Sequence, residues 1–479
     1  MKHFRTLLVF LPLYAMCPCT VEAQQSQNSE SLPTTWYVAA GGSGDGRSPA
    51  APFGSTEEVE KASAPGDIIV VLSRADRLGG GLALKPRQIL RGFATNSRRP
   101  VITNTSEERN GGNGVVLSKD SRIEGIEIRD THASGVFGRD VGAVALSDVS
   151  IHGANRSRGL IVENPLAPLP HAGVALMASP ESGSQTARLS RVHVVEAAGM
   201  AIGANALAGA RLTLDLYDVE VIGGAGFGNA DYGIAATANG RGSEASLQMT
   251  RSRVRGRTSP GARNVVLAAS DHGTVKGLIY ESFIGESGQD GVLAAALTLP
   301  ATIDVSIVGS TIENGAQSNV EGTFLAFPHE PNDVADSSIA ISIHRSTIRG
   351  AGQGPLFGER GSNVLLTGSF IPEGQPLVAA PYSLRITDST IEDGSAFGLA
   401  VGSFKGLPTA DPGHFDVLVR NTKFIGNRGG EIMIGAPEAR LDARGNCWRS
   451  PDDESEPRVI TYWVEEPAAA ETSERVSCE

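Results

Sequence analysis

The stretch Ile386-Thr387-Asp388-Ser389-Thr390-Ile391 decides the fold, because its pattern of apolar and polar residues returns along most of the 479-residue chain. We call the last residue of this pattern the reference position of a repeat. Reference positions recur, mostly 20 to 36 residues apart, at Ile128, Ile151, Val194, Val221, Val254, Ile284, Ile312, Ile348, Ile371, Ile391, Phe424 and Trp448. A period of this length predicts a solenoid, in which each repeat buries its apolar face against the next.

Two columns of this alignment carry a strand signature. Five residues before the reference position every repeat has an apolar residue: Ile123, Leu146, Leu189, Leu216, Met249, Ile279, Ile307, Ile343, Leu366, Ile386, Val419 and Ala443. Two residues before it the repeats carry mainly valine and serine, as at Val149, Val192, Val219, Ser252, Ser282, Ser310, Ser346, Ser369 and Ser389. Polar residues separate these columns, and such alternation predicts short β-strands.

Each repeat also supplies a second short apolar strand, as at residues 233–236, 264–267, 291–294, 398–401 and 431–434. Repeats this short leave no room for crossover helices, so their strands stack directly on those of neighbouring repeats. The 58 glycines and the aromatic content of 5% suit many tight turns around small apolar layers. We therefore predict an all-β fold, a right-handed parallel β-helix, with its repeats in residues 121–449.

A column of charges lies three residues before the reference position. Successive repeats carry alternating acids and bases there, at Asp148, Arg191, Asp218, Arg251 and Glu281. Parallel strands lie about 4.8 Å apart, so we expect a ladder of opposite charges along one face. Each exposed pair contributes less than about 1 kcal/mol, and its main effect is on the register of the repeats.

Both ends of a β-helix expose strand edges that need a cover. Residues 55–58 have the Ser-x-x-Glu pattern of a capping box, which predicts a short helix to about Ala64, followed by Pro65-Gly66. We assign this helix to an N-terminal cap and first coils at residues 24–120. The acidic segment 450–479 is expected to fold back over the last coil.

The N-terminus has the features of a signal peptide. Lys2 and Arg5 precede the apolar residues 7–15, and Val21-Glu22-Ala23 offers a cleavage site, so residues 1–23 are predicted to be removed on export. A less favoured alternative makes Cys17 a lipidated residue. After cleavage before Gln24 we predict a secreted protein, extracellular, on the cell surface or in the periplasm.

Two cysteines remain after cleavage, Cys447 and Cys478. In an exported chain they suggest one disulfide that closes the C-terminal segment, worth about 3 kcal/mol for a loop of this size. The alternative is two unpaired thiols.

The composition also limits the partners of the protein. The formal net charge of −12 disfavours nucleic acid and anionic membrane surfaces, because both attract clustered Lys and Arg. Beyond the N-terminal segment no apolar run is long enough to span a membrane.

Segments at both ends of the chain resemble the secreted pectate-lyase-like proteins with right-handed β-helix repeats. The opening resemblance lies in Trp36-Tyr37-Val38, Gly41-Gly42, Asp45-Gly46, Pro52-Phe53 and Pro65-Gly66-Asp67-Ile68-Ile69, and the closing one in Asp442-Ala443-Arg444-Gly445-Asn446-Cys447-Trp448. The resemblance implies a β-helix over most of the mature chain. The group includes polysaccharide lyases, polygalacturonase-like hydrolases and surface proteins without known activity, so fold alone does not choose a function.

The catalytic motifs of that group do not match this chain. Its polygalacturonase-like members pair aspartates with Gly-His-Gly and Arg-Ile-Lys segments, whereas this chain has only Asp271-His272-Gly273, which we expect in a turn. Its pectate lyases use an Arg or Lys base beside calcium-binding carboxylates, and no matching block of aspartates occurs here. The resemblance brings calcium into consideration as a cofactor, but the sequence assigns it no ligands.

One cluster of residues suggests a site. His193, Glu220 and Arg253 occupy the column just before the reference position in three successive repeats, with Tyr217 and Tyr280 nearby. On one outer face, Arg253 would neutralise a uronate carboxylate, His193 or Tyr217 would move a proton, and the tyrosines would stack on sugar. The alternative is a solvated face with ordinary ion pairs.

Two classes of function follow. The first is a protein that binds or cleaves extracellular polysaccharide, as a lyase or a glycoside hydrolase, because a long β-helix face offers a groove along an extended sugar chain. The second is a non-enzymatic surface adhesin or structural scaffold, which the alanine-rich second strands and the sparse aromatics favour.

Overall fold

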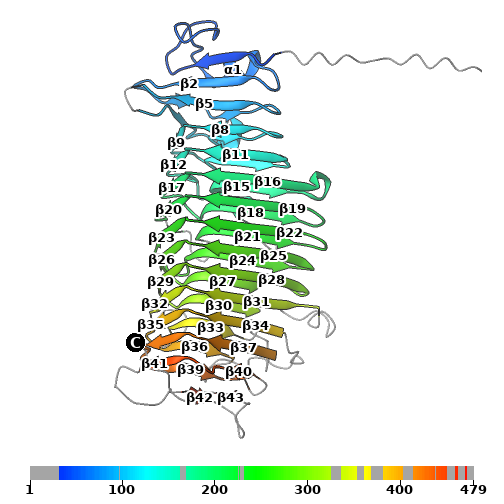
Figure 1. Cartoon of the computed structure of the whole chain (residues 1–479). Coiled ribbons are helices and arrows are strands. Elements are labelled where there is room, and N and C mark those ends of the chain that lie inside the picture. The colour runs from blue at the N-terminus through cyan, green and yellow to red at the C-terminus, as the bar shows by residue number, and fades with distance from the viewer. Residues whose placement is uncertain are drawn as a thin grey trace, which may run out of the picture. The chain divides into compact units, whose positions relative to one another are not determined.

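Three parallel sheets, wound as a right-handed β-helix, form the body of the protein (Figure 1). The computed structural model describes residues 32–95, 98–161, 169–224, 226, 231–324, 336–352, 361–367, 381–402, 414–436, 439–449, 459–461 and 470–471. Each coil runs through sheet A, then sheet B, then sheet C. The expected all-β class and parallel β-helix are confirmed.

Sheet A contains, in stacking order, β1 (Thr35–Val38), β2 (Ile68–Leu72), β5 (Ile89–Phe93), β8 (Arg122–Glu124), β11 (Ala143–Ser147), β16 (Ser184–Ser190), β19 (Arg211–Tyr217), β22 (Glu244–Thr250), β25 (Gly273–Tyr280), β28 (Ala301–Val308), β31 (Ser338–His344), β34 (Pro381–Thr387), β37 (His414–Arg420), β40 (Arg440–Asp442) and β43 (Ala470–Glu471).

Sheet B contains β3 (Leu78–Gly79), β6 (Val101–Thr103), β9 (Glu127–Arg129), β12 (Ser150–His152), β17 (His193–Val195), β20 (Glu220–Ile222), β23 (Arg253–Arg257), β26 (Phe283–Ser287), β29 (Thr311–Gly315), β32 (Thr347–Arg349), β35 (Thr390–Glu392), β38 (Lys423–Ile425) and β41 (Cys447–Arg449).

Sheet C contains β4 (Leu82–Ala83), β7 (Val115–Val116), β10 (Val136–Arg139), β15 (Ala172–Ala178), β18 (Met200–Leu207), β21 (Tyr232–Asn239), β24 (Arg263–Ser270), β27 (Asp290–Ala296), β30 (Ser318–Phe324), β33 (Ser362–Thr367), β36 (Phe397–Val401), β39 (Gly430–Ile434) and β42 (Val459–Thr461). Outside the sheets lie the helix α1 (Thr56–Ala62), the 3-10 turns η1 (Asn110–Gly112) and η2 (Pro180–Ser182), and the antiparallel pair β13 (Leu160–Ile161) and β14 (Leu169–Pro170).

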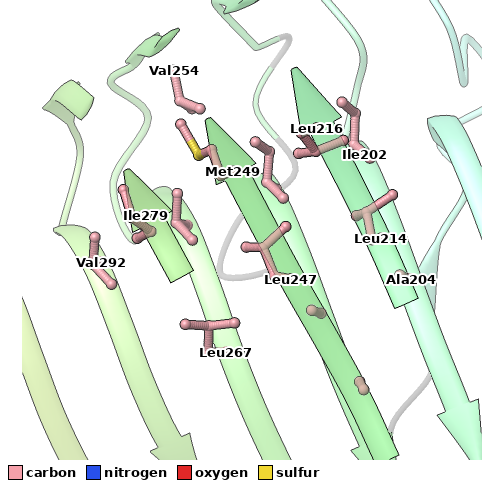
Figure 2. Packing of buried hydrophobic residues seen from close by; sticks show 14 of the residues in the cluster. Ile202, Ala204, Leu214, Leu216, Leu247, Met249, Val254, Leu267, Ile279 and Val292 are labelled. Atoms are coloured by element: carbon pink, nitrogen blue, oxygen red, sulfur yellow. The ribbon is translucent and has the colours of Figure 1, made fainter. Parts of the chain in front are cut away.

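The core lies inside the coils and follows from the alternation in the strands. In β22 the side chains of Leu247 and Met249 are buried, while Gln248 between them faces outward. Figure 2 shows these two residues beside Leu214 and Leu216 of the preceding coil, with Leu267 of sheet C close by. Each such residue contributes about 1.5–3 kcal/mol by burial, so the stability of the fold grows with every coil.

The reference positions form one buried row along sheet B. Ile151 pairs with Val194, Val194 with Val221, and the row continues to the pair of Phe424 and Trp448, whose rings stack at 4.7 Å. The predicted register is therefore confirmed along sheet B, with one exception.

The exception is the repeat placed at Ile371. Ile348 pairs directly with Ile391, so no coil lies between them, and Leu366 belongs to β33 of sheet C. Both Ser369 and Ile371 lie outside the described residues. The strand of sheet C has the same apolar alternation as a strand of sheet A, and this led the sequence pattern to count one long coil as two.

The charged column coincides with the turn between sheets A and B. The φ angles are positive throughout this column. They are 51° to 55° at Asp148, Arg191 and Asp218, and 47° at Arg251. Ion pairs join Arg191 to Asp148 at 2.8 Å and Arg251 to Asp218 at 2.9 Å, as the alternating charges predicted. Left-handed backbone at one residue turns the chain sharply without a longer loop.

The predicted capping box forms at the start of α1. Ser55 accepts a hydrogen bond from the backbone N–H of Glu58, whose carboxylate accepts one from the backbone N–H of Ser55. Val59 is fully buried and belongs to the main core, so the helix packs on the first coils as expected.

Several predictions concern residues outside the described part of the chain. The signal peptide at 1–23, most of the acidic segment 450–479, and Cys478 all lie there, so the predicted export, C-terminal cover and disulfide stay predictions. Among the described residues, no helix is long and apolar enough to cross a membrane.

Candidate functional site

The three residues predicted as catalytic meet on the outer face of sheet B. His193, Glu220 and Arg253 lie directly opposite one another on the neighbouring strands β17, β20 and β23. His193 Nδ1 lies 3.2 Å from Glu220 Oε2, and Arg253 Nη1 lies 3.9 Å from Glu220 Oε1. The side chains of His193 and Arg253 are 45% and 57% exposed, so solvent reaches both groups.

The two predicted sugar-stacking residues lie on the adjacent sheet. Tyr217 ends β19 and Tyr280 ends β25, both in sheet A before the sharp turn. The guanidinium of Arg251 lies 4.6 Å from the ring centroid of Tyr217, and a hydrogen bond and the charge of Glu281 raise the pKa of Tyr280. The tyrosines therefore lie on the sheet before the turn, and His193, Glu220 and Arg253 on the sheet after it.

A second acid–base group on the same face escaped the sequence reasoning. His152 Nε2 lies 3.8 Å from Glu127 Oε1, and Glu127 also contacts Arg129. Burial first, and then the charge of Arg129, lower the pKa of His152 and so favour its neutral ring. The sequence carries this signal one residue after the reference position, where His152 follows Ile151, whereas the predicted site lies in the column before that position.

A cavity of about 520 Å³ opens beside this face. It lies where sheet B turns toward sheet C, and its lining includes Asp130, Arg156, Arg158 and Glu196. Arg156 Nη1 lies 3.1 Å from Asp130 Oδ1. Glu196 follows β17 directly, so the cavity begins about 10 Å along the chain from His193. Charged side chains of both signs line a space large enough for a small ligand or part of a polymer.

The outer face of sheet C carries a different group of charges, also missed from the sequence. Arg263 Nε donates to Asp290 Oδ2 at 3.0 Å, and the hydroxyl of Ser318 donates to Asp290 Oδ1 at 2.7 Å. Asp290 is fully buried and Glu321 is 7% exposed. We call Arg263, Asp290, Gln317, Ser318 and Glu321 the sheet C cluster.

Burial dominates the electrostatics of the sheet C cluster. It raises the pKa of Glu321 well above the usual range, and the neighbouring charge of Asp290 raises it further. A sequence signal existed, because Glu321 stands in an outward column that is otherwise apolar, between Leu293 and Leu365. Only the stacking of the coils shows that Asp290 is its neighbour.

Asp271 and His272 form the predicted turn between β24 and β25, and Gly273 begins β25. Asp271 and His272 have φ angles of 48° and 64°, and His272 Nε2 lies 3.0 Å from the guanidinium of Arg241. This turn joins sheet C to sheet A, whereas His193 lies on β17 of sheet B, so we assign the turn no part in that site.

Comparison with known proteins gives similarity of fold only. No protein-family model matches the chain, and no curated protein sequence matches it either. A structure of the periplasmic alginate epimerase AlgG is 12% identical with a TM-score of 0.41, covering 85% of this chain and 82% of that one. The lacto-N-biosidase of family GH136 from Eubacterium ramulus is 12% identical with a TM-score of 0.35 and 91% and 68% coverage.

A further structure, of pectate lyase Pel9A, is 13% identical with a TM-score of 0.31 and covers 92% of this chain and 82% of that one. These neighbours act on polysaccharides or oligosaccharides according to their names. Identities this low say nothing about the site residues of the present chain, and its own three parallel sheets establish the fold.

Proposed function

We propose that the protein is exported, binds an extracellular polysaccharide along the outer face of sheet B, and cleaves it by proton transfer at His193. The contact of His193 with Glu220, beside Arg253 and next to the cavity, carries this proposal. A base, the carboxylate that orients it and a cation for an anionic substrate lie within three neighbouring strands on an exposed face.

The orientation of His193 fits the role of a base. Its Nδ1 faces the Glu220 carboxylate at 3.2 Å, so the proton of the neutral ring lies on Nδ1 and the lone pair on Nε2. Glu220 also stabilises the charged ring that forms when Nε2 takes a proton. Glu220 would therefore orient the neutral ring before the proton transfer and stabilise the charged ring after it.

Arg253 would bind the carboxylate of a uronate residue. The guanidinium lies 5.6 Å from the ring centroid of Phe283 and 3.9 Å from Glu220, so it is held on one side while more than half of its side chain remains exposed. Pairing with the substrate carboxylate disperses the negative charge that develops when the neighbouring carbon loses its proton.

The reaction that these groups support is an elimination. His193 Nε2 takes the proton from the carbon beside the uronate carboxylate, and the released electron pair forms a C=C double bond. The C–O bond to the next sugar breaks, and its oxygen takes a proton from solvent. His193 then returns its proton to solvent, so the balance needs no oxidant or other reactant.

A screen of the purified mature protein against polysaccharides tests this function. Binding and the ultraviolet absorbance of unsaturated products are followed together, because the C=C bond absorbs whereas a hydrolysis product does not. An acidic polysaccharide that binds and gives the absorbing product supports the lyase. Binding with new reducing ends but without absorbance would replace it by a hydrolase.

A non-enzymatic scaffold is the second candidate. Its supporting observation is the scarcity of sugar-stacking surfaces: among the described residues, the exposed large aromatic side chains are Phe93 and Tyr217. Absence of binding to every polysaccharide in the screen would favour this candidate.

A further inference from the structure

The sheet C cluster surrounds its two carboxyl groups with oxygen atoms. Arg263, Asp290, Ser318 and Ser362 follow one another in a single register column across the strands β24, β27, β30 and β33. The Ser318 hydroxyl lies 2.7 Å from Asp290 Oδ1 and 3.3 Å from Glu321 Oε2, so it joins the carboxyl groups. Adjacent coils therefore supply the two acids and the hydroxyl to one small volume.

An amide oxygen without a partner lies beside these carboxyl groups. Gln317 is 2% exposed, and its amide nitrogen donates to Glu321 Oε2 at 3.3 Å. The carbonyl oxygen of the same amide has no hydrogen-bond partner, and the same is true of Gln289, which precedes Asp290 and is 5% exposed. A buried acceptor left without a partner costs about 1–3 kcal/mol, so a ligand that pairs with the Gln317 oxygen would stabilise the folded chain.

The charges favour a cation as that ligand. Two carboxyl groups and one guanidinium share this buried place, so a cation that displaces the proton of Glu321 would meet one net negative charge. Its remaining acceptors are all oxygen atoms of carboxylate, amide and hydroxyl groups, which hard cations prefer over thiolate or imidazole. Among the described residues, no three His, Cys, Asp or Glu side chains group as a metal site, so amide and hydroxyl oxygens would have to complete this one.

We propose that Asp290, Glu321 and the Gln317 amide oxygen bind a divalent cation of the calcium type, which ties the coils of β27 and β30 together. Calcium accepts six to eight oxygen ligands in flexible geometry, whereas magnesium demands a small regular octahedron. The mixture of carboxylate, amide and hydroxyl oxygens from two coils suits the former. The role is structural and is independent of any activity on the face of sheet B.

Calcium titration of the mature chain tests the site. After treatment with a chelator, the protein is titrated with calcium chloride by calorimetry, and its Tm is measured with and without millimolar calcium. We expect binding of one calcium ion per chain at this site and a rise of Tm by several degrees, because a ligand of the folded state alone stabilises it. Magnesium should give a smaller rise.

Two variants place the effect at the cluster. Glu321→Gln keeps the shape of the side chain and should remove the calcium-dependent rise of Tm, and Gln317→Met should weaken the binding while it fills a similar volume. Asp304→Asn is the control, because Asp304 is an exposed carboxylate on strand β28 of sheet A. The control should retain the full rise.

Three results would overturn the proposal. The first is a parent protein that shows neither heat of binding nor a change of Tm in calcium. The second is a Glu321→Gln variant that keeps the parental rise of Tm. The third is a loss of the rise in Asp304→Asn, which would assign it to the general negative charge of the chain. If Glu321→Gln does not fold, the test is Gln317→Met: a smaller calcium-dependent rise of Tm supports the site, and a parental rise contradicts it.

Discussion

The hydroxyl of Ser282 accepts a hydrogen bond from the backbone N–H of Ser252 at 3.1 Å and donates one to the carbonyl of Tyr280 at 2.9 Å. The same pair of bonds returns at Ser310 and Ser346, so a ladder of serines runs through the turn between sheets A and B. Each serine satisfies two backbone groups that the left-handed turn removes from the sheets.

Removing one hydroxyl from this ladder should cost stability. Ser282→Ala leaves the N–H of Ser252 and the carbonyl of Tyr280 buried without that partner, and we expect a loss of about 1–3 kcal/mol. Urea unfolding measures it. Ser246→Ala, at a partly exposed outward position of β22, should change the midpoint little, and an equal loss in both variants would mean that the ladder has no special role.

The register of the core makes a second prediction. Ile307 is fully buried between Ile279 and Ile343, so Ile307→Asp places an unpaired carboxylate in the core and should cost several kcal/mol. Thr311→Asp, on the outer face of β29, is the control. Unfolding of both variants at the parental denaturant concentration would contradict the assigned register.

A third prediction concerns the C-terminal cysteines. Cys447 lies on β41, and if it is joined to Cys478 the exported protein unfolded without reductant should contain no free thiol. A thiol reagent counts the free groups. Two thiols per chain would remove the bridge and with it the proposed attachment of the segment 450–479 to the last coil.

Stability should also depend on the protonation of a half-buried histidine. Burial, and then the charge of His132, lower the pKa of His171, whose Nδ1 lies 3.2 Å from the hydroxyl of Ser134. The unfolded chain therefore binds a proton more readily than the folded one below about pH 6.5, so acidification from pH 7 toward pH 5 favours unfolding.

His171→Asn tests this account. Without the titrating ring, the loss of stability between pH 7 and pH 5 should become smaller, because one proton fewer is taken up on unfolding. Denaturant unfolding at several pH values gives the difference. An unchanged pH dependence would show that other groups cause it.

The sequence predicts the parts of this fold that repeat from coil to coil. Ile284 and Ile312 face the same core because one apolar position per strand is enough to define a column. The prediction of a repeat at Ile371 was wrong because the long coil there carries a sheet C strand with the same alternation of apolar and polar residues. Single-sequence patterns count strands well, but they do not say which sheet a strand joins when the intervening segment varies in length.

The candidate sites were predictable only where their residues share a column. His193 and Glu220 occupy equivalent positions of successive repeats, so stacking alone brings them together. Asp290 and Glu321 occupy different positions of their strands, and the hydroxyl of Ser318 contacts both carboxyl groups. The environment that raises the pKa of Glu321 depends on burial, which has no local pattern in the sequence.

The sharpest functional prediction concerns Arg253. Its ion pair with Glu220 is long and exposed, so Arg253→Ala should change the free energy of unfolding by less than about 1 kcal/mol. If an acidic polysaccharide is cleaved at this face, the same variant should lose about 100-fold or more in kcat/KM, because the charge of the substrate carboxylate is no longer neutralised.

Arg349→Ala is the matched control for that loss. Arg349 lies three strands further along sheet B, is about half exposed and pairs with Glu313 at 2.6 Å, so it is an arginine of the same sheet, paired with a carboxylate, at a distance from His193. It should keep the parental kcat/KM, whereas His193→Ala should lose as much as Arg253→Ala. Parental rates in both Arg253→Ala and His193→Ala would place the reaction elsewhere on the protein, because neither the base nor the cation of the proposed elimination would then be needed.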